Sequence, residues 1–324
     1  MKKFTLVIAL MMAACLFAGT ALAADAKYIM RIGTTTEPDG HYHKGLLHFK
    51  EKVEGYTNGQ VQVDIFLSSQ LGNERDMIEG LSMGLLEGSL TSSAPLANFS
   101  PDFLLLDLPY IVTDREKAYK VMDGEVGQAI LGTMTDKGVL ALGFWENGFR
   151  QVTNSKRPIV NPADLKGLKI RTMENPIHQY TFEFFGVTPT PMAWSEVFLA
   201  LQQGTIDGQE NPLIIIDTVK VYEVQKYISL TGHFYSPAVF MLSKQIFDSY
   251  PKDIQDAILK AEKEARDWER AYSAQLDMEL EKSLAAKGVS INTVDKDAWQ
   301  KACAPIYEKF QDRINPAYIK AMTE

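Results

Sequence analysis

PKDIQDAILKAEKEARDWERAYSAQLDMELEKSLAAKG, residues 251–288, is the longest helical pattern in the chain. Pro251 suits a first helical turn, and Gly288 suits a C-terminal stop. Between them apolar residues recur every three or four positions, at Ile254, Ile258, Ala261, Ala265, Trp268, Tyr272, Leu276, Leu280 and Leu284. At 1.5 Å per residue, about 35 residues span roughly 50 Å, which is more than one small domain covers. The pattern therefore predicts a helix that straddles two lobes, with a coiled-coil seam as the alternative.

Short β-like runs alternate with helical patterns before this helix. We expect strands at 28–33, 61–66, 89–93, 139–145 and 168–171, and helices at 42–54 and 73–86. A turn at Thr57-Asn58-Gly59 separates the first helix from the second strand. This alternation is typical of an α/β protein with largely parallel sheets.

The N-terminus has the pattern of a secretory signal. Lys2 and Lys3 precede an apolar run over residues 4–19, and Ala21-Leu22-Ala23 forms a small-x-small cleavage site. We therefore predict a signal peptide over residues 1–23 and export of the remaining chain to the periplasm. Cys15 follows a poor lipobox, so we interpret it as part of the apolar run and not as a lipid anchor.

Size, charge and cysteine content bound the function of the exported chain. Cleavage leaves about 300 of the 324 residues, enough for two domains of about 150 each. Removing Lys2 and Lys3 takes the net charge from −8 to about −10, which argues against nucleic acid or an anionic membrane as partner. Only Cys303 remains, so no internal disulfide is possible.

Seven segments carry a family resemblance. They are SQLGNER (69–75), GFRQVTNS (148–155), DLKGLKIR (164–171), PTPMAWSE (189–196), ALQQG (200–204), DGQENP (207–212) and YEVQKY (222–227). In order and spacing they resemble the DctP-type TRAP transporter periplasmic solute-binding proteins over nearly the whole exported chain.

The resemblance implies a fold and a function. The fold is a two-lobed α/β periplasmic binding protein, type II-like, whose long C-terminal helix braces both lobes. The expected boundaries are 24–148 plus 237–276 for lobe I and 149–236 plus 277–324 for lobe II, with the helix over about 251–287. The function is capture of a small organic acid by its carboxylate and delivery to the small and large membrane subunits of a transporter driven by an ion gradient. A monomer without metal or cofactor is the default expectation.

Three residues of these segments are the expected carboxylate ligands. Arg171 ends a predicted strand, and open α/β sheets bind ligands at the carboxyl ends of their strands. Its guanidinium matches the two oxygens of a carboxylate, and the resemblance makes Arg171 the main clamp. The resemblance also implies that Arg150 supplies a second donor to the ligand, with a structural salt bridge as the alternative. It further implies that Asn211 hydrogen-bonds the carboxylate or a neighbouring oxygen.

The remaining candidates bear on ligand selectivity. Trp194 stands where relatives commonly carry phenylalanine, so it either stacks on a flat or apolar ligand or packs into the core. Hydroxyl and carboxyl groups after the first-lobe strands, at Thr35, Thr36, Glu37, Ser92 and Ser93, are expected to face the cleft. Tyr235 either closes over the ligand or packs between the lobes. Two ligand classes stay open: a sugar acid or hydroxy acid, and an aromatic or branched 2-oxo acid. Sialate-binding relatives carry glutamate and arginine where this chain has Ser92 and Pro95, so the resemblance does not extend to sialic acid as ligand.

Three alternative functions were suggested by other features of the sequence or by the cleft itself. Residues 80–84, GLSMG, match the nucleophile pattern G-x-S-x-G of exported hydrolases, but a helix is expected there instead of a strand–turn–helix elbow. His41, His43 and His48 lack a partner at metal-ligand spacing, and we expect them to be solvated. A periplasmic sensor that addresses a histidine kinase would use the same cleft, so this alternative stays open.

Overall fold

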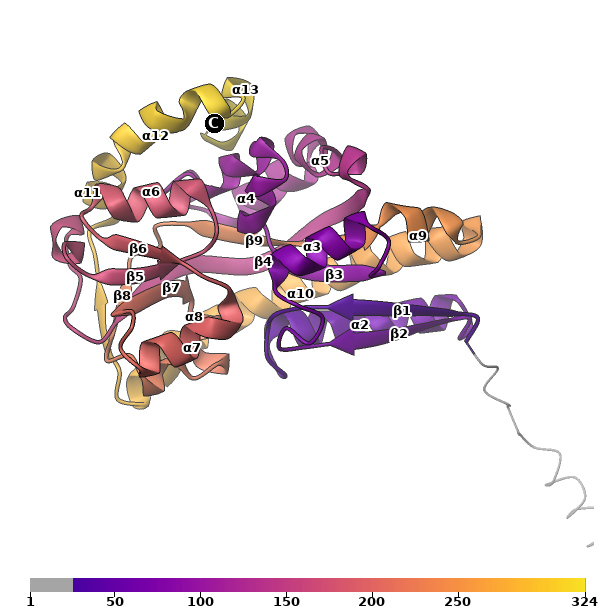
Figure 1. Ribbon diagram of the computed structural model, residues 1–324, viewed down its shortest axis with the longest axis horizontal. Coiled ribbons are helices and arrows are strands. Elements are labelled where there is room, and N and C mark those ends of the chain that lie inside the picture. Colours follow the sequence, from indigo (N-terminus) through magenta and orange to yellow (C-terminus); the bar gives the residue numbers. More distant parts are fainter. Residues whose placement is uncertain (1–25, 324) are drawn as a thin grey trace, which may run out of the picture.

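The computed structural model describes residues 26–323, so the predicted signal peptide and Cys15 lie outside the described residues. These residues form two α/β lobes around one extended sheet (Figure 1). The strands are β1 (Tyr28–Gly33), β2 (Val61–Phe66), β3 (Gly88–Ser92), β4 (Val139–Asn154), β5 (Lys169–Thr172), β6 (Thr188–Pro191), β7 (Gly208–Pro212), β8 (Tyr227–Leu230), β9 (Tyr235–Ser243) and β10 (Ser290–Thr293).

Helices cover the sheet. The α-helices are α2 (His41–Tyr56), α3 (Glu74–Ser82), α4 (Arg115–Asp123), α5 (Glu125–Gly132), α6 (Pro176–Phe184), α7 (Trp194–Gln202), α8 (Leu213–Thr218), α9 (Lys244–Ser249), α10 (Lys252–Ala286), α11 (Lys296–Ala302), α12 (Ala304–Phe310) and α13 (Pro316–Thr323). The 3-10 helices are η1 (Ala94–Asn98), η2 (Pro101–Asp107), η3 (Thr135–Lys137), η4 (Pro162–Leu165), η5 (Val221–Glu223) and η6 (Gln311–Arg313).

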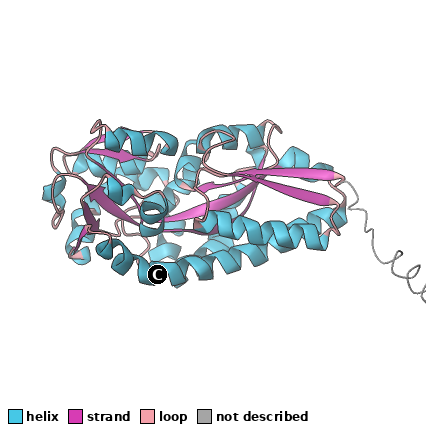
Figure 2. Cartoon of the chain, turned by 90° about the horizontal axis from the view of Figure 1, so that it is seen from below, coloured by secondary structure: helices cyan, strands magenta, loops and turns pink. Residues whose placement is uncertain are grey.

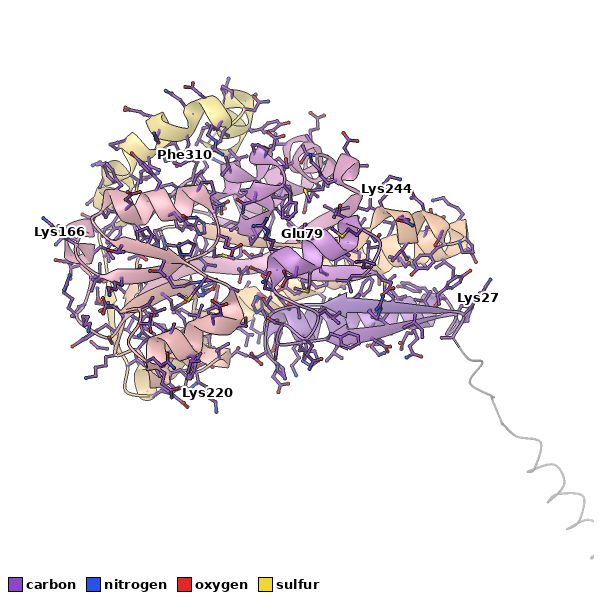
Figure 3. The ribbon with its side chains drawn as sticks, viewed as in Figure 1. Lys27, Glu79, Lys166, Lys220, Lys244 and Phe310 are labelled. Carbon is purple, nitrogen blue, oxygen red and sulfur yellow. The ribbon has the colours of Figure 1, made fainter. Side chains whose placement is uncertain are left out.

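The strand order is β2-β1-β3-β9-β4-β7-β5-β6, with β8 on β4 and β10 on β8. In Figure 1, β1, β2 and β3 lie on the right, β5, β6 and β7 on the left, and β4 and β9 between them. Lys27 and Lys166 lie near opposite ends of the molecule (Figure 3). The outer pairs are parallel, as expected, but each antiparallel pair involves β4 or β9. The prediction of largely parallel sheets therefore holds only for the outer strands, because β4 and β9 form an antiparallel pair in the middle of the sheet.

Strand β4 is shared by both lobes. We expected it to end at Trp145, but it continues to Asn154. Its first part pairs with β9, and its last residues pair with β7 and β8. The pairing shifts register between Glu146 and Gly148, a bulge at which Gly148 has φ +128°. The exchange of partners allows one strand to continue from one lobe into the other. The lobe boundaries given above stay a prediction.

Helix α10 confirms the predicted long helix in extent and position (Figures 1 and 2). Pro251 is its N-cap, and Gly288, two residues past its end, has a φ of +87° that favours glycine. Ile258 and its apolar neighbours pack into the core of the first lobe with α2. Leu280 and Leu284 pack into the core of the second lobe with α7 and α8. The helix therefore braces both lobes and does not form a coiled-coil seam.

The middle of α10 departs from the predicted apolar stripe. Trp268 is 38% exposed and stacks on Tyr272 at the surface. Besides Ala265, the side chains buried in this part are polar: Glu262, Arg266, Glu269, Arg270 and Ser273. A stripe at 3.5-residue spacing drifts around a helix of 3.6 residues per turn, so the aromatic residues turn away from the sheet.

These polar side chains bind β4 where its ladder is irregular. Glu269 Oε2 accepts a hydrogen bond from the Glu146 backbone N–H at 3.0 Å, and Arg270 Nε donates to the Phe144 carbonyl at 3.0 Å. Bulges leave backbone groups without a strand partner, and buried backbone groups need one. Gly45 on α2 allows the close approach, since an added Cβ would lie 2.7 Å from Glu269.

The stability of the protein should depend on pH through Glu269. Burial, together with the nearby Glu146 charge, raises the pKa of Glu269 to about 8. The folded state then binds more protons than the unfolded state between the unfolded pKa of about 4.3 and 8, so stability falls as pH rises through this window. The wild type should lose free energy of unfolding between pH 5 and pH 8. In Glu269→Gln we expect this decrease to be smaller by roughly 2 to 4 kcal/mol.

Urea unfolding of both proteins at pH 5, 6, 7 and 8 measures the difference. Glu264→Gln is the control, because Glu264 lies on the same helix but is held near the surface by Tyr56 and Lys52. Its pH profile should follow that of the wild type. Parallel profiles for Glu269→Gln and the wild type would mean that Glu269 ionises without penalty.

Candidate functional site

A cavity of about 340 Å³ lies between the two lobes. Its lining from the first lobe and the start of the crossing is Thr35, Thr36, Tyr42, Glu74, Ser92 and Asn147, and from the second lobe Arg150, Arg171, Met173, Trp194, Asn211 and Ile215. Thr35 follows β1, Ser92 ends β3 and Arg171 lies near the end of β5. The carboxyl ends of parallel strands thus meet at the cavity, as in open α/β sheets generally.

Arg171 is held in place without an acidic partner. Its Nε and Nη2 donate to the Met192 carbonyl at 3.0 and 2.8 Å, and its guanidinium lies 5.6 Å from the Trp194 ring centroid. The side chain is buried, and the salt bridges of the described residues do not include it. Burial and the charge of Arg150 lower the pKa of Arg171 to about 10. At neutral pH this is a buried cation whose Nη1 has no hydrogen-bond partner and which forms no salt bridge within residues 26–323.

Arg150 forms the structural salt bridge that was the alternative considered for it. It is fully buried, and its Nε and Nη2 bind the Glu210 carboxylate, with Nη2 to Oε1 at 2.8 Å. His233 Nε2 lies 3.3 Å from the same carboxylate. Burial alone would raise the pKa of Glu210, but Arg150 and His233 hold it well below its usual value. Arg150 Nη1 has no hydrogen-bond partner, so the structural salt bridge leaves one donor available beside the cavity.

Asn211 lies at the cavity end of β7. Its Nδ2 donates to Gln209 Oε1 at 2.6 Å, which fixes the amide orientation. Gly208, at the start of the strand, allows β7 to pair closely with β4, because an added Cβ would lie 2.1 Å from the Thr153 carbonyl oxygen. The glycine is thus required by the strand packing that places Asn211.

The first-lobe candidates divide into two groups. Thr35, Thr36 and Ser92 line the cavity. Ser93 is buried but is not among the lining residues, and Glu37 accepts a hydrogen bond from the Ser68 hydroxyl outside it.

Tyr235 also lies away from the cavity lining. Its hydroxyl donates to Glu146 Oε2 at 2.8 Å, and its ring packs on Phe149 with centroids 5.1 Å apart. This is a contact between β9 and β4. The structure therefore favours packing between the crossing strands over contact with a ligand.

Five lining residues were missed by the sequence analysis: Tyr42, Glu74, Asn147, Met173 and Ile215. The Tyr42 hydroxyl and Asn147 Oδ1 are buried without a hydrogen-bond partner. Glu74 belongs to the segment SQLGNER, and Asn147 directly precedes GFRQVTNS, so proximity to these segments was an available signal. Tyr42 gave none, because it fits the apolar face of α2.

Two rival sites are not formed. Ser82 is the last residue of α3 and its hydroxyl donates to the Lys137 carbonyl at 2.5 Å. GLSMG is therefore the end of a helix followed by a turn, and not the strand–turn–helix of a nucleophile elbow. The expectation of solvated histidines is wrong for His41, which is fully buried, and burial lowers its pKa to about 3. Within residues 26–323 no three His, Cys, Asp or Glu side chains are grouped to hold a metal ion. No helix in residues 26–323 is long and apolar enough to cross a membrane.

Comparisons with known proteins agree with the fold and the cavity. The family of bacterial extracellular solute-binding proteins, family 7, named DctP, matches residues 32–313. A TRAP periplasmic solute-binding protein from a Polaromonas species, solved with D-erythronate, is 41% identical with a TM-score of 0.89, covering 91% of this chain and 98% of that one. Another from Sulfurospirillum deleyianum, solved with succinate, is 34% identical with a TM-score of 0.88, covering 92% and 98%.

A curated relative gives the same assignment. The 2,3-diketo-L-gulonate-binding periplasmic protein of Escherichia coli is 36% identical over 287 residues, which are 88% of this chain and 87% of that protein. The two lobes, the bracing helix, the arginine-lined cavity and these matches agree, and the chain belongs to the DctP family of TRAP transporter solute-binding proteins.

Proposed function

We propose that this protein is a periplasmic receptor that captures a hydroxylated small organic acid, a sugar acid or hydroxy acid, by its carboxylate. The observation that carries the proposal is the state of Arg171, a buried cation that donates only from Nε and Nη2 and forms no salt bridge within residues 26–323. A ligand carboxylate would supply the missing anion, with Arg150 Nη1 and Asn211 beside it. The pairing is charge-assisted and excluded from water, which makes it strong.

The cavity lining favours a hydroxylated acid over an aromatic 2-oxo acid. Hydroxyl, amide and carboxylate groups line much of the cavity, and several of them have no protein partner. The Trp194 ring already lies against the Arg171 guanidinium, so it supports the clamp. Relatives bind D-erythronate and 2,3-diketo-L-gulonate, both of which carry hydroxyls.

Capture would proceed by closure of lobe I (24–148 and 237–276) on lobe II (149–236 and 277–324) about β4 and β9. Closing an empty cleft would desolvate Arg171 without an anion, so the ligand would favour the closed form. A monomer would then deliver the acid to the small and large membrane subunits of a TRAP transporter. A periplasmic sensor feeding a histidine kinase is the alternative; genes for transporter membrane subunits beside this one would argue against it.

A thermal-shift screen of the exported chain tests the ligand class. At 100 times its Kd, a ligand adds about 2.7 kcal/mol of stability, which should raise Tm by about 5 °C for a chain of this size. We expect this rise with sugar acids and hydroxy acids, and none with aromatic 2-oxo acids. Neutral polyols of the same carbon number, such as erythritol for erythronate, are the matched controls. A shift with the polyols, or with no acid, would contradict carboxylate capture.

A further inference from the structure

We infer that Glu74 is a specificity-determining residue that selects monocarboxylates carrying a hydroxyl beyond the carboxylate and rejects dicarboxylates. The inference rests on the proposed function and deepens it. It assigns a role to the one acidic side chain among the residues that line the cavity.

Glu74 is fixed at the cavity by local structure. It lies in the first turn of α3, which Asn73 and Asp76 cap reciprocally. Its Oε1 accepts a hydrogen bond from the Ser92 backbone N–H at 2.8 Å, and Oε2 has no partner within residues 26–323. Burial raises the pKa of Glu74, while the Ser92 N–H, Arg171 and Arg150 oppose this rise. A helix N-terminus also favours the ionised form. The site thus presents a fixed carboxyl group with one oxygen available, whose ionised form Arg171, Arg150 and the Ser92 N–H favour.

The cavity is polarised between its two walls. Arg171 and Arg150 present donors on the second-lobe side, whereas Glu74 presents an acceptor on the first-lobe side. An ionised carboxylate only accepts hydrogen bonds, so the ligand end that faces Glu74 has to donate. A hydroxyl does this without adding charge, and Asn147 and the Tyr42 hydroxyl offer further neutral partners.

Other ligand ends fit this wall poorly. A second carboxylate would face Glu74 with like charge in a poorly hydrated space. A keto or alkyl end cannot donate a hydrogen bond and would leave the Glu74 carboxylate unpaired. Leaving a desolvated acceptor unpaired costs more binding free energy than weakening a contact. An α-ammonium would lie next to the ligand carboxylate and therefore beside the two arginines, where its charge is repelled.

Calorimetric titration with two matched sets of acids tests the inference. The four-carbon set is D-erythronate, butanoate and succinate, and the six-carbon set is D-gluconate, hexanoate and adipate. In the better-fitting set we expect the hydroxylated acid to bind the wild type about 100-fold more tightly than either partner. Alanine, added as the amino-acid probe, should bind no better than butanoate.

The variant Glu74→Gln should weaken the hydroxylated acid at least 10-fold, leave the alkyl acid unchanged and strengthen the dicarboxylate. Gln can still accept from the Ser92 N–H, so the fold is kept. Glu79→Gln is the matched control, since Glu79 lies on the same helix but is exposed and pairs with Arg75 (Figure 3). Equal losses for all acids, or no change in their ranking, would overturn the role of Glu74. Failure of every acid to bind the wild type would instead overturn carboxylate capture itself.

Discussion

Replacing Arg171 by methionine should weaken binding of every carboxylate ligand by about 1,000-fold, which corresponds to about 4 kcal/mol. The loss is large because the remaining donors cannot supply a full positive charge: Arg150 is already paired with Glu210, and Asn211 is neutral. Arg171→Lys keeps the charge but loses the planar fork, so its affinity should fall between the two.

The same substitution should leave the ligand-free protein at least as stable as the wild type. Burial and Arg150 penalise the Arg171 charge in the folded state, as its lowered pKa shows, and methionine removes that penalty. The Met192 carbonyl loses two donors but is only half-buried, so water can replace them.

Calorimetric titration gives the affinities and thermal melting gives the stabilities. The matched control is Arg157→Met, because Arg157 also donates to two backbone carbonyls, those of Asp164 and Lys166, but is exposed and does not line the cavity. Its variant should bind normally. If Arg171→Met binds acids as the wild type does, another group holds the carboxylate.

Removing one member of the buried pair Arg150–Glu210 should destabilise the protein by about 3 to 5 kcal/mol. Both side chains are fully buried, and the pair joins neighbouring strands β4 and β7. Arg150→Met leaves the Glu210 carboxylate with only His233 beside it. Glu210→Gln leaves Arg150 buried without its paired carboxylate, next to the charge of Arg171.

The double variant Arg150→Met/Glu210→Leu separates charge from packing. If the penalty comes from the charge left without its partner, the double variant should recover most of the stability lost in Arg150→Met. Urea unfolding of the wild type, both single variants and the double variant completes the cycle. Additive losses would show that the side chains act through packing and not as an ion pair.

These predictions separate two uses of buried charge in this protein. The charges of Arg150 and Glu210 neutralise each other and the pair holds two strands together. Removing either residue should therefore lower the stability of the protein. Arg171 and Glu74 form no salt bridge within residues 26–323, so replacing them should change ligand affinity and selectivity. A pocket whose charges are completed by its ligand is less stable when empty, which is a common cost of function.

Local sequence determined the elements whose signals are short-range. β1 and β2 have the predicted bounds, because alternation over six residues and the turn at Asn58-Gly59 fix them without distant partners. α10 was predictable because Pro251 and Gly288 mark its ends. The family segments located Arg171, Arg150, Asn211 and Trp194, and the end of a predicted strand located Ser92. The structure brings all five to one cavity.

Tertiary structure alone decided the features that depend on distant backbone. β4 continues past Trp145 because β7 and β8, more than fifty residues later in the chain, supply its hydrogen-bond partners. The middle of α10 buries Glu269 and Arg270 because backbone groups of β4 need partners there. The long-range pairing of β4 with β9 places Tyr235 against Phe149. Glu74 and Arg171, from different lobes, line the same cavity. A sequence pattern reports which face of an element is apolar, but not which backbone groups, charges or cavities that face will meet.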